Sequence, residues 1–156
     1  MGILQVRAYF ETNGIPERII EFAESSATVA LAARALGVEE KLIAKTLSFD
    51  VAGEPILIVT AGDTRIDNRK YKDTFSHKAR LLSADEALKA TGHPVGGVCP
   101  FALAGPVTVY LDVSLKRFET VYPAAGSAAS AVAITPGRLQ EITGAEWIDV
   151  CKLPGE

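Results

Sequence analysis

The sequence has 156 residues, of which 48% are hydrophobic and 22% are charged, and its formal net charge is −3. This balance is typical of one globular domain over residues 1–156, and it excludes collagen-like, coiled-coil and disordered classes. A small acidic excess also argues against nucleic-acid binding through a broad basic surface.

The two cysteines, Cys99 and Cys151, lie far apart and lack the spacing of a zinc site or a disulfide framework. We therefore expect no bound metal and a reducing, cytoplasmic location. Residues 1–10 lack the basic region and cleavage site of an export signal, and the apolar runs are too short to cross a bilayer. No membrane partner is expected.

The first third of the chain predicts a helix, a strand and a second helix. Apolar residues at helical spacing favour a helix over residues 3–13, which Asn13 and Gly14 end. Residues 18–22 predict a strand, and Ser25 and Ser26 are expected to cap a helix that continues to Ala35.

Large and small side chains alternate over residues 43–51, which is typical of a strand. A turn with Gly53 separates this stretch from the apolar run 56–61, so the two segments predict a hairpin. Because the second strand is apolar throughout, we expect it in the middle of a sheet.

The remaining sequence alternates short helices with short strands. A short helix is expected to start over residues 68–72, and Ser83 with Glu86 forms a capping box for a helix that ends at Gly92. Further strands are expected over 81–82, 107–111, 119–122 and 131–134, and a last helix over 136–142. Strands joined by both hairpins and helices favour an α/β fold with a bent mixed sheet and helices packed around it.

Lys45 is the most informative single residue, because alternation places it on the same strand face as Ile43, Leu47 and Phe49. In one interpretation its stem packs on the core while the nitrogen reaches solvent at a sheet edge. In the other, this face lines a pocket in which the ammonium meets an anionic or carbonyl-bearing ligand, since a buried unpaired charge is costly.

Residues 92–101, GHPVGGVCPF, form a dense glycine loop after a predicted helix. Glycines let main-chain N–H groups approach a ligand closely, and consecutive N–H groups can surround an oxyanion or a phosphate. The alternative is a connection that needs glycines only to turn, and neither GxGxxG nor GxxxxGK[ST] occurs in the chain. Small residues over 123–130 likewise either leave room for a ligand or form a surface loop.

Three further groups of residues allow two interpretations each. Cys99 and His93 could form the thiolate and base of a hydrolase, although a loop cysteine is more often a small apolar filler. Asp112 either orients a site group or stabilises a turn at a strand end.

Residues 65–80 carry six basic and two acidic residues, a net charge of +4. They form either a phosphate-contact patch, with Tyr71 and Phe75 available for stacking, or a solvated helix face that also carries His77.

Four segments in chain order resemble the YbaK/EbsC family, the free-standing relatives of the editing domain inserted in bacterial prolyl-tRNA synthetases. They are ALGV at 35–38, IAKTL at 43–47, GGVCPF at 96–101 and AGS at 125–127. The resemblance covers about residues 20–143. It implies a bent, mostly antiparallel sheet surrounded by helices, and hydrolysis of the ester in a mischarged aminoacyl-tRNA without a cofactor.

The resemblance also assigns site residues by position. Lys45 would be the catalytic residue that fixes the terminal nucleotide and the ester. The remaining substrate-binding positions would be Thr46, His93, Gly96, Gly97, Val98, Cys99, Pro100, Gly126 and Ser127, with the loop main chain stabilising the oxyanion. Arg65, Arg69, Lys70 and Lys72 are the expected contacts to tRNA phosphates.

No protein base stands out at these positions, so we expect a free hydroxyl of the terminal ribose to help activate water. A small pocket would admit alanine, serine, cysteine or similar residues, with tRNA-Pro as one acceptor. Alanine-specific relatives tend to carry asparagine where this chain has Thr46, and several relatives have serine or threonine in place of Cys99, which leaves the amino acid open.

A non-catalytic module of the same fold that captures a nucleotide or a tRNA end is the alternative function. In both cases the expected partner is the acceptor end of a tRNA. The sequence leaves open whether a synthetase or an elongation factor takes part, and whether the protein is a monomer or a homodimer.

Overall fold

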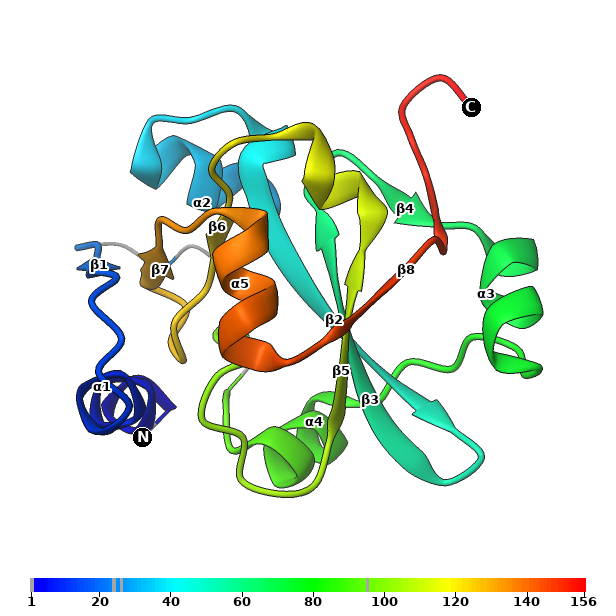
Figure 1. Ribbon diagram of the computed structural model, residues 1–156, viewed down its shortest axis with the longest axis horizontal. Coiled ribbons are helices and arrows are strands. Elements are labelled where there is room, and N and C mark those ends of the chain that lie inside the picture. Colours follow the sequence, from blue (N-terminus) through cyan, green and yellow to red (C-terminus); the bar gives the residue numbers. More distant parts are fainter. Residues whose placement is uncertain (1, 24, 26, 95) are drawn as a thin grey trace.

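The computed structural model describes residues 2–23, 25, 27–94 and 96–156, and its centre is a five-stranded sheet (Figure 1). The strand order is β6 (Tyr122–Pro123), β2 (Ile43–Val51), β3 (Glu54–Ala61), β5 (Thr108–Asp112) and β8 (Glu146–Ile148). Strands β2 and β3 form the predicted antiparallel hairpin. Ala52 and Gly53 both have positive φ at its turn, as a type I′ turn requires.

Two small sheets flank the central one, and both are antiparallel. Strand β1 (Ile19–Glu21) pairs with β7 (Ser130–Val132), and β4 (Arg65–Ile66) pairs with β9 (Cys151–Lys152). The bent, mixed α/β sheet is thus confirmed. Its antiparallel part consists of the hairpin and the small sheets, whereas the other three neighbouring pairs of the central sheet are parallel because crossovers connect them.

Helices surround the sheet (Figure 1). They are α1 (Gly2–Thr12), α2 (Val29–Leu36), α3 (Asn68–Phe75), α4 (Ala84–Thr91) and α5 (Pro136–Thr143), with 3-10 turns η1 (Glu40–Leu42) and η2 (Val113–Arg117). None of the described helices is long and apolar enough to cross a membrane.

The helix caps show where local sequence decides a boundary. The capping box of Ser83 and Glu86 is confirmed at the start of α4. The expected cap of α2 is wrong: Thr28 is the N-cap, and its hydroxyl accepts the N–H of Leu31, because Thr28 lies three residues before that free donor. Ser26 lies outside the described residues.

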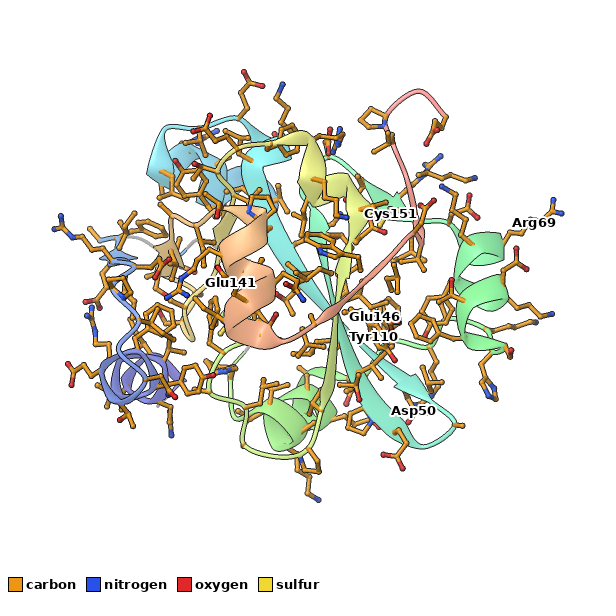
Figure 2. All side chains as sticks on the ribbon, in the orientation of Figure 1. Asp50, Arg69, Tyr110, Glu141, Glu146 and Cys151 are labelled. Atoms are coloured by element: carbon orange, nitrogen blue, oxygen red, sulfur yellow. The ribbon has the colours of Figure 1, made fainter. Side chains whose placement is uncertain are left out.

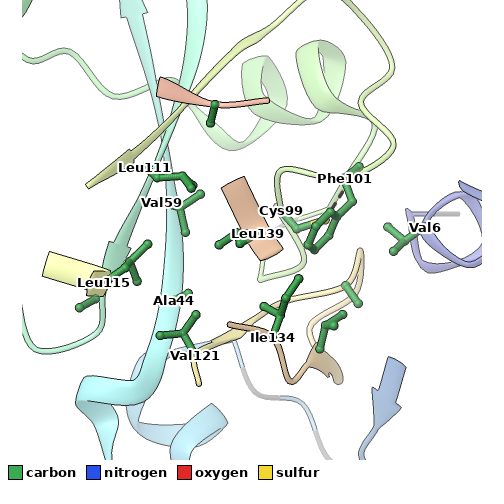
Figure 3. Close-up of a cluster of buried hydrophobic side chains, with 14 of the residues drawn as sticks. Val6, Ala44, Val59, Cys99, Phe101, Leu111, Leu115, Val121, Ile134 and Leu139 are labelled. Carbon is green, nitrogen blue, oxygen red and sulfur yellow. Dashed lines mark hydrogen bonds between the residues drawn. The ribbon is translucent and has the colours of Figure 1, made fainter. Parts of the chain in front are cut away.

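Two apolar clusters fill the interior, one on each face of the hairpin. The larger contains Ala44, Val59 and Leu111 from the strands, together with Leu139 of α5 and the loop residues Cys99 and Phe101 (Figure 3). The smaller contains Phe49, Ile58, Tyr71, Val150 and Cys151. Alternation along β2 therefore directs Ala44 and Thr46 toward one cluster and Lys45, Leu47 and Phe49 toward the other.

Asp112 has the structural role of the two that the sequence allowed. Its buried carboxylate accepts the N–H of Ser114 at 2.9 Å and the N–H of Val150 at 2.8 Å. It thereby caps η2 and connects the end of β5 to the segment before β9.

Candidate functional site

A pocket of about 390 Å³ opens along the outer edge of β2, on the side away from β3. Its walls come from the N-terminal ends of α2 and α4, the glycine loop, β6 and β7. Of the predicted site residues, Lys45, Thr46, Gly96 and Val98 line it. The pocket therefore brings residues 43–48 together with Gly96 and Val98, which lie about a third of the chain away.

Lys45 is the only charged residue among the described residues of the pocket lining. Its ammonium donates a hydrogen bond to the main-chain carbonyl of Thr64, on the same face as Leu47. Burial lowers the pKa of Lys45, and the nearby Cys151 and Asp63 partly offset that effect. The ammonium thus meets a carbonyl of its own chain, which occupies one of its three N–H groups.

A fork of two hydrogen bonds holds the turn that carries the Thr64 carbonyl. The guanidinium of Arg117 contacts the two carboxylate oxygens of Asp63 at 2.6 and 3.2 Å, and the two side chains are 29% and 20% exposed. Bidentate geometry fixes orientation as well as distance. Sequence analysis missed this pair, because the two residues are 54 positions apart and neither belongs to a motif.

Thr46 contributes an unusual polar atom to the pocket wall. Its hydroxyl oxygen is buried and has no hydrogen-bond partner among the described residues. Most buried hydroxyls in proteins are paired, so an unpaired one at a pocket is a potential ligand contact.

The glycine loop packs directly on the small-residue turn at 125–130. A Cβ on Gly97 would lie 2.5 Å from the nitrogen of Ser127 and 2.6 Å from the carbonyl carbon of Gly126. The Ser127 hydroxyl donates to the Ser130 hydroxyl oxygen at 3.0 Å, inside the turn. Gly97, Gly126 and Ser127 therefore support the pocket from behind its lining, whereas Ser130 lines it.

His93, Cys99 and Pro100 are also buried behind the loop and do not line the pocket. The Nε2 of His93 donates to the carbonyl of Phe101 at 2.7 Å and lies 3.6 Å from the Cys99 sulfur. Burial lowers the pKa of His93 and raises the pKa of Cys99 to about 12. The pair is therefore a neutral imidazole beside a protonated, inaccessible thiol, which argues against the cysteine-hydrolase interpretation.

The basic segment lies away from the pocket. Helix α3 with Arg69 is at the right of the molecule, while α2, β6 and β7 are at the left (Figures 1 and 2). Lys70 is occupied, because its ammonium contacts Asp149 at 3.2 Å and the Cys151 carbonyl at 2.9 Å. Arg65, Arg69, Lys72 and His77 are exposed.

The stacking role considered for the aromatic residues of this segment is wrong. Tyr71 is fully buried, and the ring of Phe75 packs against Tyr71 and Tyr110 with centroids 4.8 and 5.2 Å apart. The amphipathic helix α3 uses these rings to cover the smaller cluster.

No group of three or more histidine, cysteine, aspartate or glutamate side chains that could hold a metal occurs among the residues described. What the described lining offers is hydroxyl groups and main-chain N–H and C=O groups, together with Lys45, whose ammonium is bonded to the Thr64 carbonyl.

The model of the aminoacyl-tRNA editing domain family matches residues 23–142. This chain belongs to that family. The relationship expected from the four sequence segments is thus confirmed, and the matched residues include every described residue that lines the pocket.

Individual relatives agree with this assignment. The editing domain is 53% identical to the uncharacterized protein YwhH of Bacillus subtilis over 97% of this chain and 98% of YwhH. It is 35% identical to a segment of the proline--tRNA ligase of Nitratidesulfovibrio vulgaris that covers 52% of this chain and 14% of the ligase. A solved protein proposed as a trans-editing enzyme for prolyl tRNA synthetase superimposes with a TM-score of 0.89, at 29% identity and 97% coverage of both chains.

Proposed function

We propose that this editing domain hydrolyses the ester of mischarged aminoacyl-tRNAs that carry a small amino acid such as alanine, serine or cysteine, with tRNA-Pro as one acceptor. The pocket carries this proposal, because it gathers Lys45, Thr46, Gly96 and Val98 in a member of this family. Its volume of about 390 Å³ is near the lower end of ligand pockets. Once a terminal adenosine enters, little space is left for a large side chain.

The chemistry follows from which groups line the pocket. We assign stabilisation of negative charge to Lys45, whose ammonium would leave the Thr64 carbonyl to reach the ester. Main-chain N–H groups of the loop at Gly96 and Val98 can stabilise the oxyanion. Neither a carboxylate nor an imidazole occurs among the described residues of the lining. We therefore assign water activation to the free hydroxyl of the terminal ribose.

The reaction then balances without a cofactor. Water attacks the ester carbonyl carbon, the bond from that carbon to the ribose oxygen breaks, and the ribose oxygen takes up a proton. The products are the free amino acid and the uncharged tRNA.

The test is release of amino acid from a panel of charged tRNAs that includes alanyl-, seryl-, cysteinyl- and phenylalanyl-tRNA, on prolyl and cognate acceptors. We expect release of one or more small amino acids and none of phenylalanine, because the pocket is small. Release that does not depend on side-chain size would contradict the proposed selectivity.

A non-catalytic module that captures the tRNA end is the second candidate, and the missing protein base in the lining favours it. The same panel separates the two functions. A binding module would bind charged tRNA and slow spontaneous loss of the amino acid, whereas a deacylase accelerates it.

Contacts to the rest of the tRNA are a separate part of the proposal. Arg65, Arg69 and Lys72 are exposed cations that can contact phosphates, whereas Lys70 is committed to Asp149. Because the chain is acidic and has one modest basic segment, we expect weak intrinsic affinity for tRNA, which leaves a role for a synthetase or an elongation factor.

Replacing Cys99 by alanine is expected to leave deacylation within about threefold of the wild-type rate, since the buried thiol with a pKa of about 12 is not a nucleophile. The lost packing should lower stability by roughly 1 kcal/mol. Both are measured by single-turnover deacylation and urea unfolding. An inactive but folded Cys99→Ala variant would restore the cysteine-hydrolase interpretation.

A further inference from the structure

The outer edge of β2 has a gap in its ladder of main-chain partners. Strand β6 pairs with β2 only at Ile43 and Ala44. Farther along, the N–H of Leu82 donates to the Ser48 carbonyl at 3.0 Å, and the N–H of Asp50 donates to the Arg80 carbonyl at 2.9 Å. Between these two partners no described residue pairs with the edge, and the pocket opens there.

The main-chain groups of Thr46 point into this gap. In a strand, the N–H and C=O of one residue point to the same side, and successive residues alternate between sides. Ser48 and Asp50 bond outward, so Thr46 also directs its N–H and C=O outward. No described residue is found bonded to either group, and the Thr46 hydroxyl is buried and unpaired as well.

The Lys45 side chain does not compete for this position. It extends from the face of β2 that is opposite the Thr46 side chain, and its ammonium donates to the Thr64 carbonyl. Within the part of the chain that the structure describes, the gap therefore presents one unpaired N–H and one unpaired C=O, spaced as on any unpaired strand residue.

We propose that the aminoacyl group of the substrate occupies the partner position opposite Thr46. Its α-amino group donates to the Thr46 carbonyl, and its ester carbonyl accepts the Thr46 N–H, as in a hydrogen-bonded antiparallel residue pair. The second lone pair of the ester oxygen remains available to the loop. This inference rests on the proposed deacylation and names the part of the substrate that the main chain recognises.

Recognition by the main chain has a specific consequence. The main-chain contacts are the same for every amino acid, so the pocket walls must select among the side chains. An acyl group without a hydrogen-bond donor on its α-carbon would leave the Thr46 carbonyl unpaired. An unpaired acceptor of this kind weakens binding substantially.

The experiment compares alanyl-, lactyl- and propionyl-tRNA, whose acyl groups are similar in size and carry an amino, a hydroxyl or no donor group on the α-carbon. Each kcat/KM is divided by the spontaneous hydrolysis rate of the same ester. We expect the alanyl and lactyl values to agree within about tenfold and the propionyl value to be about 10- to 100-fold lower than the alanyl one. Equal normalised values for alanyl and propionyl esters would overturn the pairing while leaving deacylation intact. If none of the three esters is hydrolysed, the proposed function fails and the pairing with it.

The Thr46→Val variant separates the main chain from the hydroxyl, because valine keeps the shape of the side chain and the main-chain groups. We expect the ratio of alanyl to propionyl hydrolysis to be unchanged in this variant. A ratio that falls to one would assign recognition of the α-amino group to the Thr46 hydroxyl and overturn the inference.

Discussion

Replacing Lys45 by methionine is expected to lower kcat/KM for amino acid release by about 100-fold or more. Lys45 is the only charged residue among the described residues of the pocket lining, and a group that stabilises a developing oxyanion contributes about 10²- to 10³-fold. Methionine retains a flexible, unbranched stem of similar length, so the packing against Leu47 should survive.

The matched control is Lys89→Met, which removes a lysine that is exposed near the end of α4 and does not line the pocket. We expect it to retain wild-type activity. Thermal unfolding of both variants completes the experiment. If Lys45→Met deacylates normally and only its thermal midpoint falls, then the ammonium serves to hold the Thr64 carbonyl and has no part in catalysis.

The parts of the fold that follow from local sequence were predictable. The hairpin of β2 and β3, the capping box at Ser83 and the alternation that separates Lys45 from Thr46 each depend on residues that are neighbours in the chain. The parallel placement of β5 and β8 beside β3 was not, because it depends on crossovers that pack distant segments together.

The candidate site also has features that local sequence predicts and features that depend on contacts between distant segments. The sequence allowed two interpretations of the loop at 92–101, a ligand-binding main chain or a simple connection, and the structure places Gly96 and Val98 at the pocket. It offered a buried, apolar role for Cys99 as one alternative, but it could not indicate that Gly97 faces the interior, since that depends on contact with the turn at Gly126 and Ser127. A loop has no fixed period that assigns its residues to faces, in contrast to a strand.

Gly97→Ala is expected to have the largest effect among substitutions of the loop. Gly97 does not have a positive φ, so alanine adds no backbone strain of that kind. Its Cβ would lie 2.5 Å from the nitrogen of Ser127 and 2.6 Å from its Cα, however, and main-chain atoms cannot rotate away. The loop must separate from the turn, which should cost about 1–3 kcal/mol of the free energy of unfolding.

Gly105→Ala is the matched control, because the nearest atom to its Cβ is the Ala90 carbonyl oxygen at 3.5 Å, an ordinary contact. We expect its stability to change by no more than about 0.5 kcal/mol and its deacylation rate to be normal. Urea unfolding and deacylation are measured on both variants at a temperature where both are fully folded.

Under those conditions loss of stability cannot explain loss of activity. A drop of tenfold or more in deacylation by folded Gly97→Ala would then mean that the displaced main chain at Gly96 and Val98 is needed for the reaction, as an oxyanion site requires. A folded variant with the wild-type rate would show that the loop only closes the pocket, and the oxyanion would have to be stabilised by Lys45 and the edge of β2.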